Sequence, residues 1–239
     1  MTHALYAETP YQMHCTTRIG AARDAGVELE ATVFYPLGGG QPGDTGWLID
    51  ASGRRQRIID TRRDRDSGAI VHLLEPGAIA SPVGSTVDIE LDWARRHRHM
   101  RMHTCLHLLS AVVPHGVTGG NLSADSGRLD FDTDGATLDA ARIQTELARL
   151  IAADLAVSTR LISGAELAAQ PELIKTLTVK PPMHLPQIRL IEIVGADLQP
   201  CGGTHVARTG EIGVMRVLKI ESKGARNRRV VLGFAEDAA

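Results

Sequence analysis

The sequence predicts an α+β fold, in which a small N-terminal β-barrel precedes a domain of antiparallel strands and two long helices. Two observations predict it. Up to about residue 91 the chain holds only short strand-like segments separated by turn residues. Beyond that point, two long segments with helical spacing of apolar residues lie among further strand-like segments. We therefore expect two domains, residues 1–91 and 92–239.

Six strand-like segments form the expected barrel. Each carries Val, Ile or Thr, and Gly, Pro, Asp or Ser separates it from the next. They cover residues 14–19, 26–35, 46–50, 54–61, 69–74 and 85–91. Short strands joined by turns favour a small barrel or sandwich. We expect the charged segment 60–68 to be a solvated turn.

The two long helices of the second domain have recognisable beginnings. Asp92 is a suitable N-cap for a helix that runs from about Ala94 to Val113. The second helix is expected within residues 137–155, where Leu, Ile and Ala recur at close to helical spacing. Thr137 or Asp134 can start it.

The rest of the second domain is expected to be mostly strands. A turn and a strand pair are predicted for residues 117–132. Ser163 and Glu166 have the spacing of a capping box, which predicts a short helix. Three prolines predict an extended loop at 180–186. Further strands are predicted at 158–163, 188–194, 211–222 and 228–234.

The composition narrows the class of protein. Hydrophobic residues make up 43% of the 239 residues and charged residues 23%, but aromatic residues only 3%, so the core must be aliphatic. The net charge of −2 gives no global sign of a polyanionic partner. Three cysteines are too few for a disulfide framework and fit a reducing compartment. The sequence shows no signal peptide and no membrane span, so we expect a cytoplasmic enzyme or binding protein.

Two histidines lie one helical turn apart in the apolar segment RMHTCLHLLSAVV, residues 101–113. His103 and His107 therefore share one face of the first long helix. Two ligands alone make a poor metal site. A pair at this spacing is more often a surface feature or a satisfied part of the core.

A second pair of metal-ligand residues follows much later, on a glycine-bearing turn. Cys201 and His205 flank Gly202 and Gly203, which leave the backbone free to bring both side chains together. With His103 and His107 they form a set of three histidines and one cysteine, which suits tetrahedral zinc. The residues alone leave metal binding and the ordinary structural interpretation both open.

Four motifs in order resemble a known family. They are FYPLGGGQPGDTG (34–46), HTCLH (103–107), CGGTHVARTGEIG (201–213) and SKGARNRR (222–229). The second and third resemble the editing domains of alanyl- and threonyl-tRNA synthetases. The whole set is similar to the free-standing alanyl-tRNA editing proteins of medium length, which carry an extra N-terminal barrel. The resemblance covers nearly the whole chain and implies that the second domain has the fold of these editing domains.

The resemblance implies an activity and a cofactor. The family hydrolyses the ester that joins a wrong amino acid, chiefly serine and often glycine, to alanine tRNA. We therefore expect an aminoacyl-tRNA deacylase that acts in trans, without ATP, on the acceptor end of mischarged alanine tRNA. One Zn²⁺ per chain is expected on His103, His107, Cys201 and His205. Whether zinc activates water or orients the tRNA 3′ end stays open, because four protein ligands normally make a closed, structural site.

Candidate substrate contacts lie in two segments. In the synthetase form of the family a Thr commonly precedes the second helix histidine, but Leu106 stands there in this sequence. Thr118, on the turn after the helix, can replace it by a hydrogen bond to the serine hydroxyl, with Gly119 and Gly120 beside it. The glycine-rich segment is expected to approach the substrate through Gly38, Gly39, Gly40, Gln41 and Asp44. The alternatives are an ordinary turn threonine and a tight connection in the barrel.

Basic residues cluster beside both ligand-bearing segments. The expected tRNA contacts are Arg95, Arg96, Arg98, Arg101, Lys219, Lys223, Arg226, Arg228 and Arg229. Such groups bind phosphates with salt-dependent affinity. The alternative is a solvated charged face. Two rival functions remain: a tRNA-binding module with structural zinc and no hydrolysis, and a metallohydrolase that acts on a small ester or amide.

Overall fold

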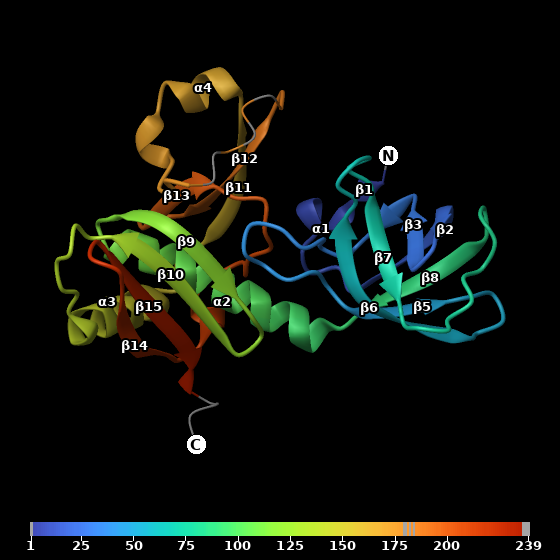
Figure 1. Ribbon diagram of the computed structural model, residues 1–239, viewed down its shortest axis with the longest axis horizontal. Helices are drawn as coiled ribbons and strands as arrows, with labels where there is room; N and C mark the ends of the chain where they lie inside the picture. The colour runs from blue at the N-terminus through green and yellow to red at the C-terminus, as the bar shows by residue number, and fades with distance from the viewer. Residues whose placement is uncertain (1, 179–180, 182, 184, 236–239) are drawn as a thin grey trace. The chain divides into compact units, whose positions relative to one another are not determined.

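Six strands close into a barrel in the first part of the chain, which is drawn in blue to blue-green in Figure 1. The structure is a computed structural model, and it describes residues 2–178, 181, 183 and 185–235. The chain divides into two units, Met1–Arg98 and His99–Ala239. The order of strands around the barrel is β2-β3-β7-β6-β5-β8. Their bounds are β2 His14–Arg23, β3 Gly26–Leu29, β5 Gly46–Ile49, β6 Arg55–Arg63, β7 Ile70–Leu74 and β8 Thr86–Leu91.

The barrel forms because its strands alternate between apolar and polar residues. In β8, for example, Val87, Ile89 and Leu91 are buried while the residues between them are exposed. The side chains of Ile19, Leu29, Phe34, Leu48, Ile58 and Ile89 fill the interior and are almost completely buried. The predicted aliphatic barrel is therefore confirmed.

Two details of the first unit differ from the sequence prediction. The expected strand 26–35 is split into β3 and β4 (Ala31–Thr32), because β4 leaves the barrel to pair in parallel with β1 (His3–Ala4). The short helix α1 (Leu5–Glu8) follows β1. The charged segment 60–68 is only partly a turn, because β6 continues to Arg63 through its pairing with β7.

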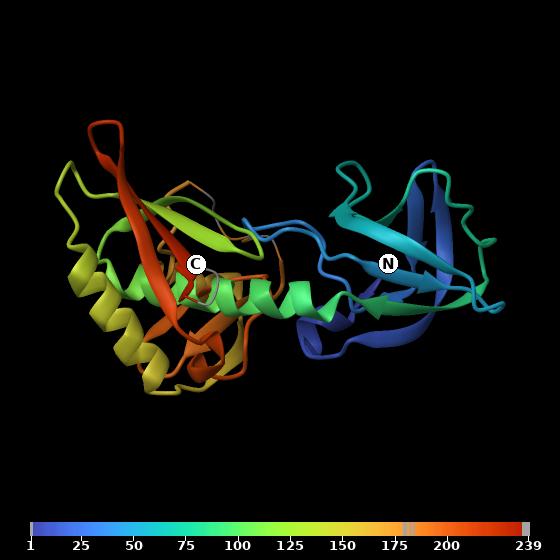
Figure 2. The same ribbon diagram turned by 90° about the horizontal axis from the view of Figure 1, so that it is seen from below.

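The second unit contains two antiparallel sheets. The first has the strand order β14-β15-β10-β9 and the second β11-β12-β13. The bounds are β9 Gly116–Leu122, β10 Ser126–Asp132, β11 Val157–Ile162, β12 Ile188–Ile193, β13 Asp197–Pro200, β14 Met215–Lys223 and β15 Asn227–Phe234. Figure 2 shows this unit from a second direction, with the β14–β15 ribbon in red and α3 (Ala140–Ala152) in yellow. The predicted α+β class is confirmed.

The long helix α2 (Trp93–Val112) contacts both sheets of the second unit. A Cβ atom on Gly127 of β10 would lie 2.7 Å from Sδ of Met102, so the helix packs closely on the first sheet. On the other side, His107 forms a hydrogen bond to Asp197 of the second sheet. This placement buries the histidine face of α2 inside the unit. Among the described residues, no helix combines the length and the apolar character that crossing a membrane requires.

The caps agree with the sequence prediction at two helices and differ at a third. Asp92 accepts a hydrogen bond from the Arg95 N–H at the start of α2. Ser163 and Glu166 form the predicted capping box of α4 (Gly164–Ala168). The cap of α3 is Asp139, whose carboxylate accepts from two backbone N–H groups, so the prediction of Thr137 or Asp134 was wrong.

Three further segments of the second unit were predicted differently. Thr118 lies in strand β9 rather than on a turn. The strand expected at 211–222 begins only at Met215, because a 3₁₀ turn, η2 (Thr209–Ile212), precedes it. The loop 180–186 lies partly outside the described residues. A second short 3₁₀ turn, η1, spans Pro171–Leu173.

Candidate metal centre

Four side chains of the second unit converge at one point. His103 and His107 come from α2, and Cys201 and His205 come from the loop after β13. One ligand atom from each lies within 4.8 Å of the other three. The three histidines are buried and Cys201 is half-buried. The two ligand pairs that lie far apart in the sequence are thus brought together.

The distances suit a tetrahedral ion. The Cys201 Sγ atom lies 3.5 Å from Nε2 of His103 and 3.3 Å from Nε2 of His205. Around a tetrahedral zinc ion, a sulfur and a nitrogen ligand are separated by roughly 3.5 Å, as follows from Zn–S and Zn–N bonds of ~2.3 and ~2.0–2.1 Å. Three imidazoles and a thiolate form a donor set that zinc accepts. The cluster can therefore hold a metal ion.

A second layer of hydrogen bonds orients the imidazoles. The Nδ1–H of His107 donates to Oδ2 of Asp197 over 2.9 Å, so Nε2 faces the cluster. The Nδ1–H of His205 donates to Oγ1 of Thr104 over 3.1 Å, and the Thr104 hydroxyl donates to the Met100 carbonyl. Carboxylate and hydroxyl partners of this kind fix the tautomer of a metal-binding histidine.

Asp197 is itself held by two further side chains. Lys175 Nζ and Gln199 Nε2 both donate to its carboxylate, the latter over 2.7 Å. Gln199 also donates to the hydroxyl of Ser110 on α2. The Asp197 carboxylate is completely buried, and a buried charge persists only when it is paired and hydrogen-bonded in this way.

The electrostatics of the cluster favour a thiolate. Burial would raise the pKa of Cys201, but the nearby His103 and His205 hold it well below its ordinary value. Burial, together with His103, lowers the pKa of His205 well below its usual range, which keeps this imidazole neutral. Burial opposes the charged form of His107 as well, but Asp197 and Cys201 outweigh it and raise the pKa of His107 to about 9. A thiolate and a neutral imidazole are the forms that bind metals, so Cys201 and His205 are ready to bind, whereas His107 has to release a proton when a metal binds.

Arg189 supports the ligand-bearing loop. Its guanidinium donates to the carbonyls of Cys201 and Gly203, over 2.9 and 2.8 Å. The Gly203 N–H in turn lies 3.4 Å from the Cys201 sulfur. These contacts fix the turn that brings Cys201 and His205 together.

Sequence reasoning missed Asp197, Thr104, Lys175, Gln199 and Arg189. Only Asp197 could have been suspected from the sequence, because it is an acidic residue four positions before the predicted ligand Cys201. The others are residue types that occur anywhere on a protein surface, and only the fold brings them to the ligands.

Of the predicted substrate contacts, Thr118, Gly119 and Gly120 lie side by side on β9. The Thr118 hydroxyl is half-buried and donates to the carbonyl of Asp130 over 3.2 Å. The Thr118 carbonyl accepts from the Thr178 hydroxyl. Their role as substrate contacts stays a prediction.

The glycine-rich segment belongs to the first unit. Gly38 and Gln41 form reciprocal backbone hydrogen bonds, and Gly39 and Gly40 have positive φ angles, so the segment is a tight turn. Gln41 is buried. The alternative of a tight connection in the barrel therefore describes this turn, and a substrate contact by Gly38, Gly39, Gly40 and Gln41 stays a prediction.

Asp44 and Arg96, which were predicted to contact the substrate and the tRNA, form a buried ion pair in the first unit. Asp44 accepts from the guanidinium of Arg96, and both side chains are at most 1% exposed. Arg96 also donates to the carbonyls of Val33 and Pro10. Because its donors are used inside the unit, Arg96 is not available to a phosphate, and Asp44 is not available to a substrate.

The remaining predicted tRNA contacts differ in exposure. Lys219 and Lys223 are exposed on β14, and Arg226 is exposed on the turn between β14 and β15. The other five, Arg95, Arg98, Arg101, Arg228 and Arg229, are partly buried. Arg229 is paired with Asp130 over 2.7 Å, Arg101 donates to the Ile212 carbonyl and covers the Phe234 ring, and Arg95 donates to the Gly43 carbonyl.

Comparison with known proteins places the chain in a family. Residues 188–231 match the family described as the threonyl and alanyl tRNA synthetase second additional domain, and residues 4–95 match the class II (A) tRNA synthetases. The chain is 31% identical to a Methanosarcina mazei protein named alanyl-tRNA editing protein AlaX-M, over 100% of this chain and 99% of that protein. It is 32% identical to a Saccharolobus solfataricus protein of the same name, over 96% and 98%.

A longer relative has the same similarity over part of its length. An alanine–tRNA ligase from Saccharolobus islandicus is 32% identical over 92% of this chain but only 25% of the ligase. The chain thus corresponds to one section of that enzyme, while it spans nearly the full length of the free-standing proteins. The protein belongs to the family of alanyl-tRNA editing proteins.

Proposed function

We propose that this protein is a trans-acting hydrolase that deacylates alanine tRNA charged with serine, and with glycine, at a zinc-containing site and without ATP. The observation that carries the proposal is the cluster of His103, His107, Cys201 and His205, in a chain that spans nearly the whole length of proteins named for alanyl-tRNA editing. The editing activity, the zinc and the acceptor end of tRNA are parts of this proposal.

The need for such an activity has a physical cause. A pocket shaped for alanine discriminates weakly against glycine, because one missing methyl(ene) group is worth only ~1–3 kcal/mol, and an added hydroxyl is also hard to reject. A separate hydrolytic site can remove the products that escape this discrimination. That correction takes place in the cytoplasm, which is where we place the protein.

The cluster residues divide into two layers. His103, His107, Cys201 and His205 would hold one zinc ion, which supplies a Lewis acid for the ester carbonyl or a fixed point for the tRNA 3′ end. Asp197 and Thr104 hold the imidazoles of His107 and His205 in the tautomer that presents Nε2. Thr118, Gly119 and Gly120 on β9 would contact the amino acid.

The tRNA would be held by exposed cations. Lys219, Lys223 and Arg226 on the β14–β15 hairpin are the exposed members of the predicted set of tRNA contacts. Their ion pairs with Glu221 and Asp132 are solvent-exposed, and such pairs contribute only ~0–1 kcal/mol, so a phosphate can replace the carboxylate at little cost. The hairpin is therefore our proposed contact to the RNA backbone.

Deacylation of Ser-tRNA(Ala) and Gly-tRNA(Ala) by the purified protein tests the proposal. The wild type should release serine from the tRNA but leave a free serine ester intact, and Cys201→Ala should abolish the release. Cys105, which is buried on α2, supplies the matched control, and Cys105→Ala should keep the activity. Hydrolysis of the free ester would instead indicate a small-ester metallohydrolase. Binding of tRNA without any hydrolysis would indicate a structural zinc module.

A further inference from the structure

Two structural reasons account for glycines in this protein. Where the backbone has a positive φ angle, a side chain is strained whatever the space around it. Where another segment of the chain lies very close, a Cβ atom has no room. Gly53, with a φ of +83°, illustrates the first reason. Gly26 illustrates the second, because a Cβ atom on it would collide with the backbone carbonyl of His72.

Gly202, in the turn that carries two metal ligands, has neither reason. Apart from its two chain neighbours, a Cβ atom on Gly202 would meet no heavy atom within 4 Å, and its φ lies outside the left-handed region. The residue is exposed, between the ligand Cys201 and the buried Gly203. A side chain at Gly202 would therefore have both room and an ordinary backbone conformation.

The turn is held by groups on either side of Gly202. The Arg189 guanidinium donates to the carbonyls of Cys201 and Gly203, and the Cys201 N–H donates to the Arg189 carbonyl. Among the described residues, neither the N–H nor the carbonyl of Gly202 takes part in a hydrogen bond. A side chain at this position would thus break no contact that shapes the turn.

Gly202 lies where the metal centre is open to solvent. His103, His107 and His205 are only 4–7% exposed, whereas Cys201 is half-buried. A molecule that reaches the cluster from solvent therefore approaches at Cys201, directly beside the bare backbone of Gly202. The free space in front of Gly202 belongs to this approach.

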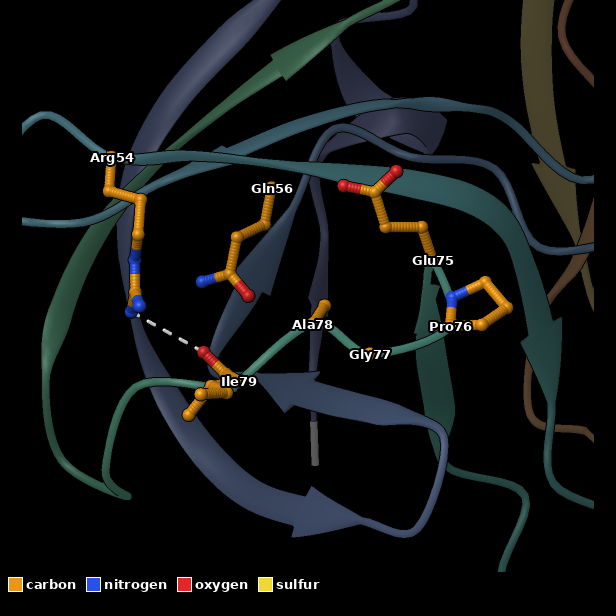
Figure 3. Close-up of a pocket in the computed structure, with 7 residues that line it drawn as sticks. All are labelled: Arg54, Gln56, Glu75, Pro76, Gly77, Ala78 and Ile79. Atoms are coloured by element: carbon orange, nitrogen blue, oxygen red, sulfur yellow. Dashed lines mark hydrogen bonds between the residues drawn. The ribbon is translucent and has the colours of Figure 1, made fainter.

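A cavity in the first unit shows that open space beside a glycine need not mean a ligand. It measures about 260 Å³, and Gly77 lines it between Pro76 and Ala78 (Figure 3). A Cβ atom on Gly77 would also meet nothing within 4 Å, but Gly77 has a φ of +84°. The backbone alone explains that glycine, and none of the four metal ligands lines the cavity. Gly202 differs in both respects.

The substrate of the proposed function ends in a group that suits bare backbone. In an aminoacyl-tRNA the amino acid is joined through an ester to the terminal ribose, so the carbonyl that is hydrolysed has a sugar ring beside it. When that carbonyl lies at the cluster, the ring has to lie close to the ligand turn. Glycine allows this close approach, and its N–H can donate to an oxygen of the ribose or the ester.

We propose that Gly202 is a substrate-contact position of the metal centre, over whose bare backbone the terminal ribose of the aminoacyl-tRNA lies. The inference rests on the proposed function, since it assumes this substrate, but it concerns the fit of the substrate and not its hydrolysis. A side chain at this position would occupy the space of the ribose. It would weaken binding of the tRNA end and leave the fold and the metal site as they are.

Binding of a stable analogue tests the inference without hydrolysis. In 3′-seryl-amino-3′-deoxyadenosine an amide replaces the ester, so the compound mimics the end of Ser-tRNA. With the full-length, zinc-loaded, ¹⁵N-labelled protein it should shift the backbone amide signal of Gly202. Gly202→Ala should bind it at least about tenfold more weakly, since a misplacement of about 1 Å can cost about a hundredfold. Gly202→Ala binding as tightly as the wild type would overturn the inference.

Two further measurements separate a substrate contact from a structural role. Because alanine fits the backbone at Gly202, the thermal unfolding midpoint of Gly202→Ala should hold or rise. Its zinc affinity, measured by competition with a chelator, should equal that of the wild type. A lower midpoint or weaker zinc binding would mean that this glycine shapes the ligand turn, and the inference would be wrong.

Two glycines of the first unit provide matched controls. Gly20 is exposed, has an ordinary φ, and a Cβ atom on it would have its nearest contact at 3.8 Å, so Gly20→Ala should lower neither stability nor binding. Gly53→Ala should lower the unfolding midpoint, because of its positive φ, but leave binding of the analogue unchanged.

The wild type shows which of the two proposals fails. If it neither binds the analogue nor hydrolyses Ser-tRNA(Ala), the proposed function is wrong, and the inference about Gly202 is wrong with it. If the wild type does both and Gly202→Ala does both equally well, only the inference about Gly202 is wrong.

Discussion

Asp197 accepts the Nδ1–H of His107 over 2.9 Å, and both side chains are almost completely buried. This contact turns Nε2 of His107 toward the cluster, so it ties a carboxylate of β13 to the metal-binding face of α2. Removing such a partner typically costs 10–100-fold in metal affinity. Asp197→Asn should therefore lower the affinity for zinc by at least about tenfold, measured by competition with a chelator of known affinity. Asp125→Asn, on an exposed turn, is the control, and unchanged zinc affinity in Asp197→Asn would contradict the role of this contact.

The β14–β15 hairpin offers a test of RNA binding. Replacing Lys219, Lys223 and Arg226 by Ala should weaken tRNA binding, and the log–log slope of affinity against salt should fall by ~0.7–0.9 for each phosphate that the variant no longer neutralises. The matched control removes three exposed arginines elsewhere in the same unit, Arg142, Arg149 and Arg160. If both triple variants have the slope of the wild type, the hairpin cations only face solvent.

The ion pair of Asp44 and Arg96 distinguishes a structural role from a binding role. Asp44→Ala leaves the Arg96 charge buried without its carboxylate, which typically costs 3–5 kcal/mol. We expect the free energy of unfolding of the first unit to fall by about that amount in denaturant titrations. The double variant Asp44→Ala, Arg96→Met should recover part of the loss, because no charge is left buried. A stable Asp44→Ala protein with impaired activity would restore Asp44 as a substrate contact.

His72 should make the barrel sensitive to acid. Its Nε2 accepts from the Thr32 hydroxyl and its Nδ1–H donates to the Val27 carbonyl, so the native barrel holds a neutral imidazole. Burial lowers the pKa of His72 to about 4. Between about pH 6.5, the unfolded value, and pH 4, the unfolded chain binds one more proton than the native one. Stability is then fully present above pH 6.5 and is lost as the pH falls, by about 3 kcal/mol in all.

The measurement compares the wild type with His72→Gln. The free energy of unfolding should fall more steeply with decreasing pH in the wild type, by up to ~1.4 kcal/mol per pH unit. The imidazole signals of His72 in NMR spectra should also stay in the neutral form down to about pH 5. Parallel pH profiles of the two proteins would show that His72 does not carry this dependence.

The sequence predicts most of the fold because its strands and helices depend on local patterns. The alternation of Val87, Ile89 and Leu91 marks a barrel strand without any knowledge of its neighbours. The capping box of Ser163 and Glu166 is likewise local. The split of residues 26–35 is not, because it depends on β1 pairing with β4, a contact between distant segments. The cap of α3 was misplaced since three nearby residues have similar capping chemistry, and only the backbone decides among them.

The same distinction holds for the candidate metal centre. His103 and His107 are four residues apart, and so are Cys201 and His205. Each pair of ligands can therefore be recognised from a short stretch of sequence. Asp197 and Lys175 carry no such spacing, so their convergence on His107 follows from the packing of β13 and of the segment after η1 against α2. The basic cluster depends on distant contacts in the same way: the sequence shows the arginines side by side, but not that Asp132 and Asp130 of β10 form ion pairs with Arg226 and Arg229 across the sheet.

Thr118 provides the test of amino-acid specificity. Its hydroxyl donates to the Asp130 carbonyl of the neighbouring strand β10, and the oxygen can still accept a hydrogen bond from the hydroxyl of a serine substrate. Thr118→Val keeps the shape of the side chain and removes that acceptor. A neutral hydrogen bond contributes roughly 0.5–1.5 kcal/mol, so hydrolysis of Ser-tRNA(Ala) should fall by on the order of tenfold. Hydrolysis of Gly-tRNA(Ala), which has no hydroxyl to lose, should hold or rise. The ratio of the two rates is the decisive quantity, because damage to the strand would lower both together. Equal losses on the two substrates would mean that Thr118 only supports β9 through Asp130 and Thr178, and that serine is recognised by other groups.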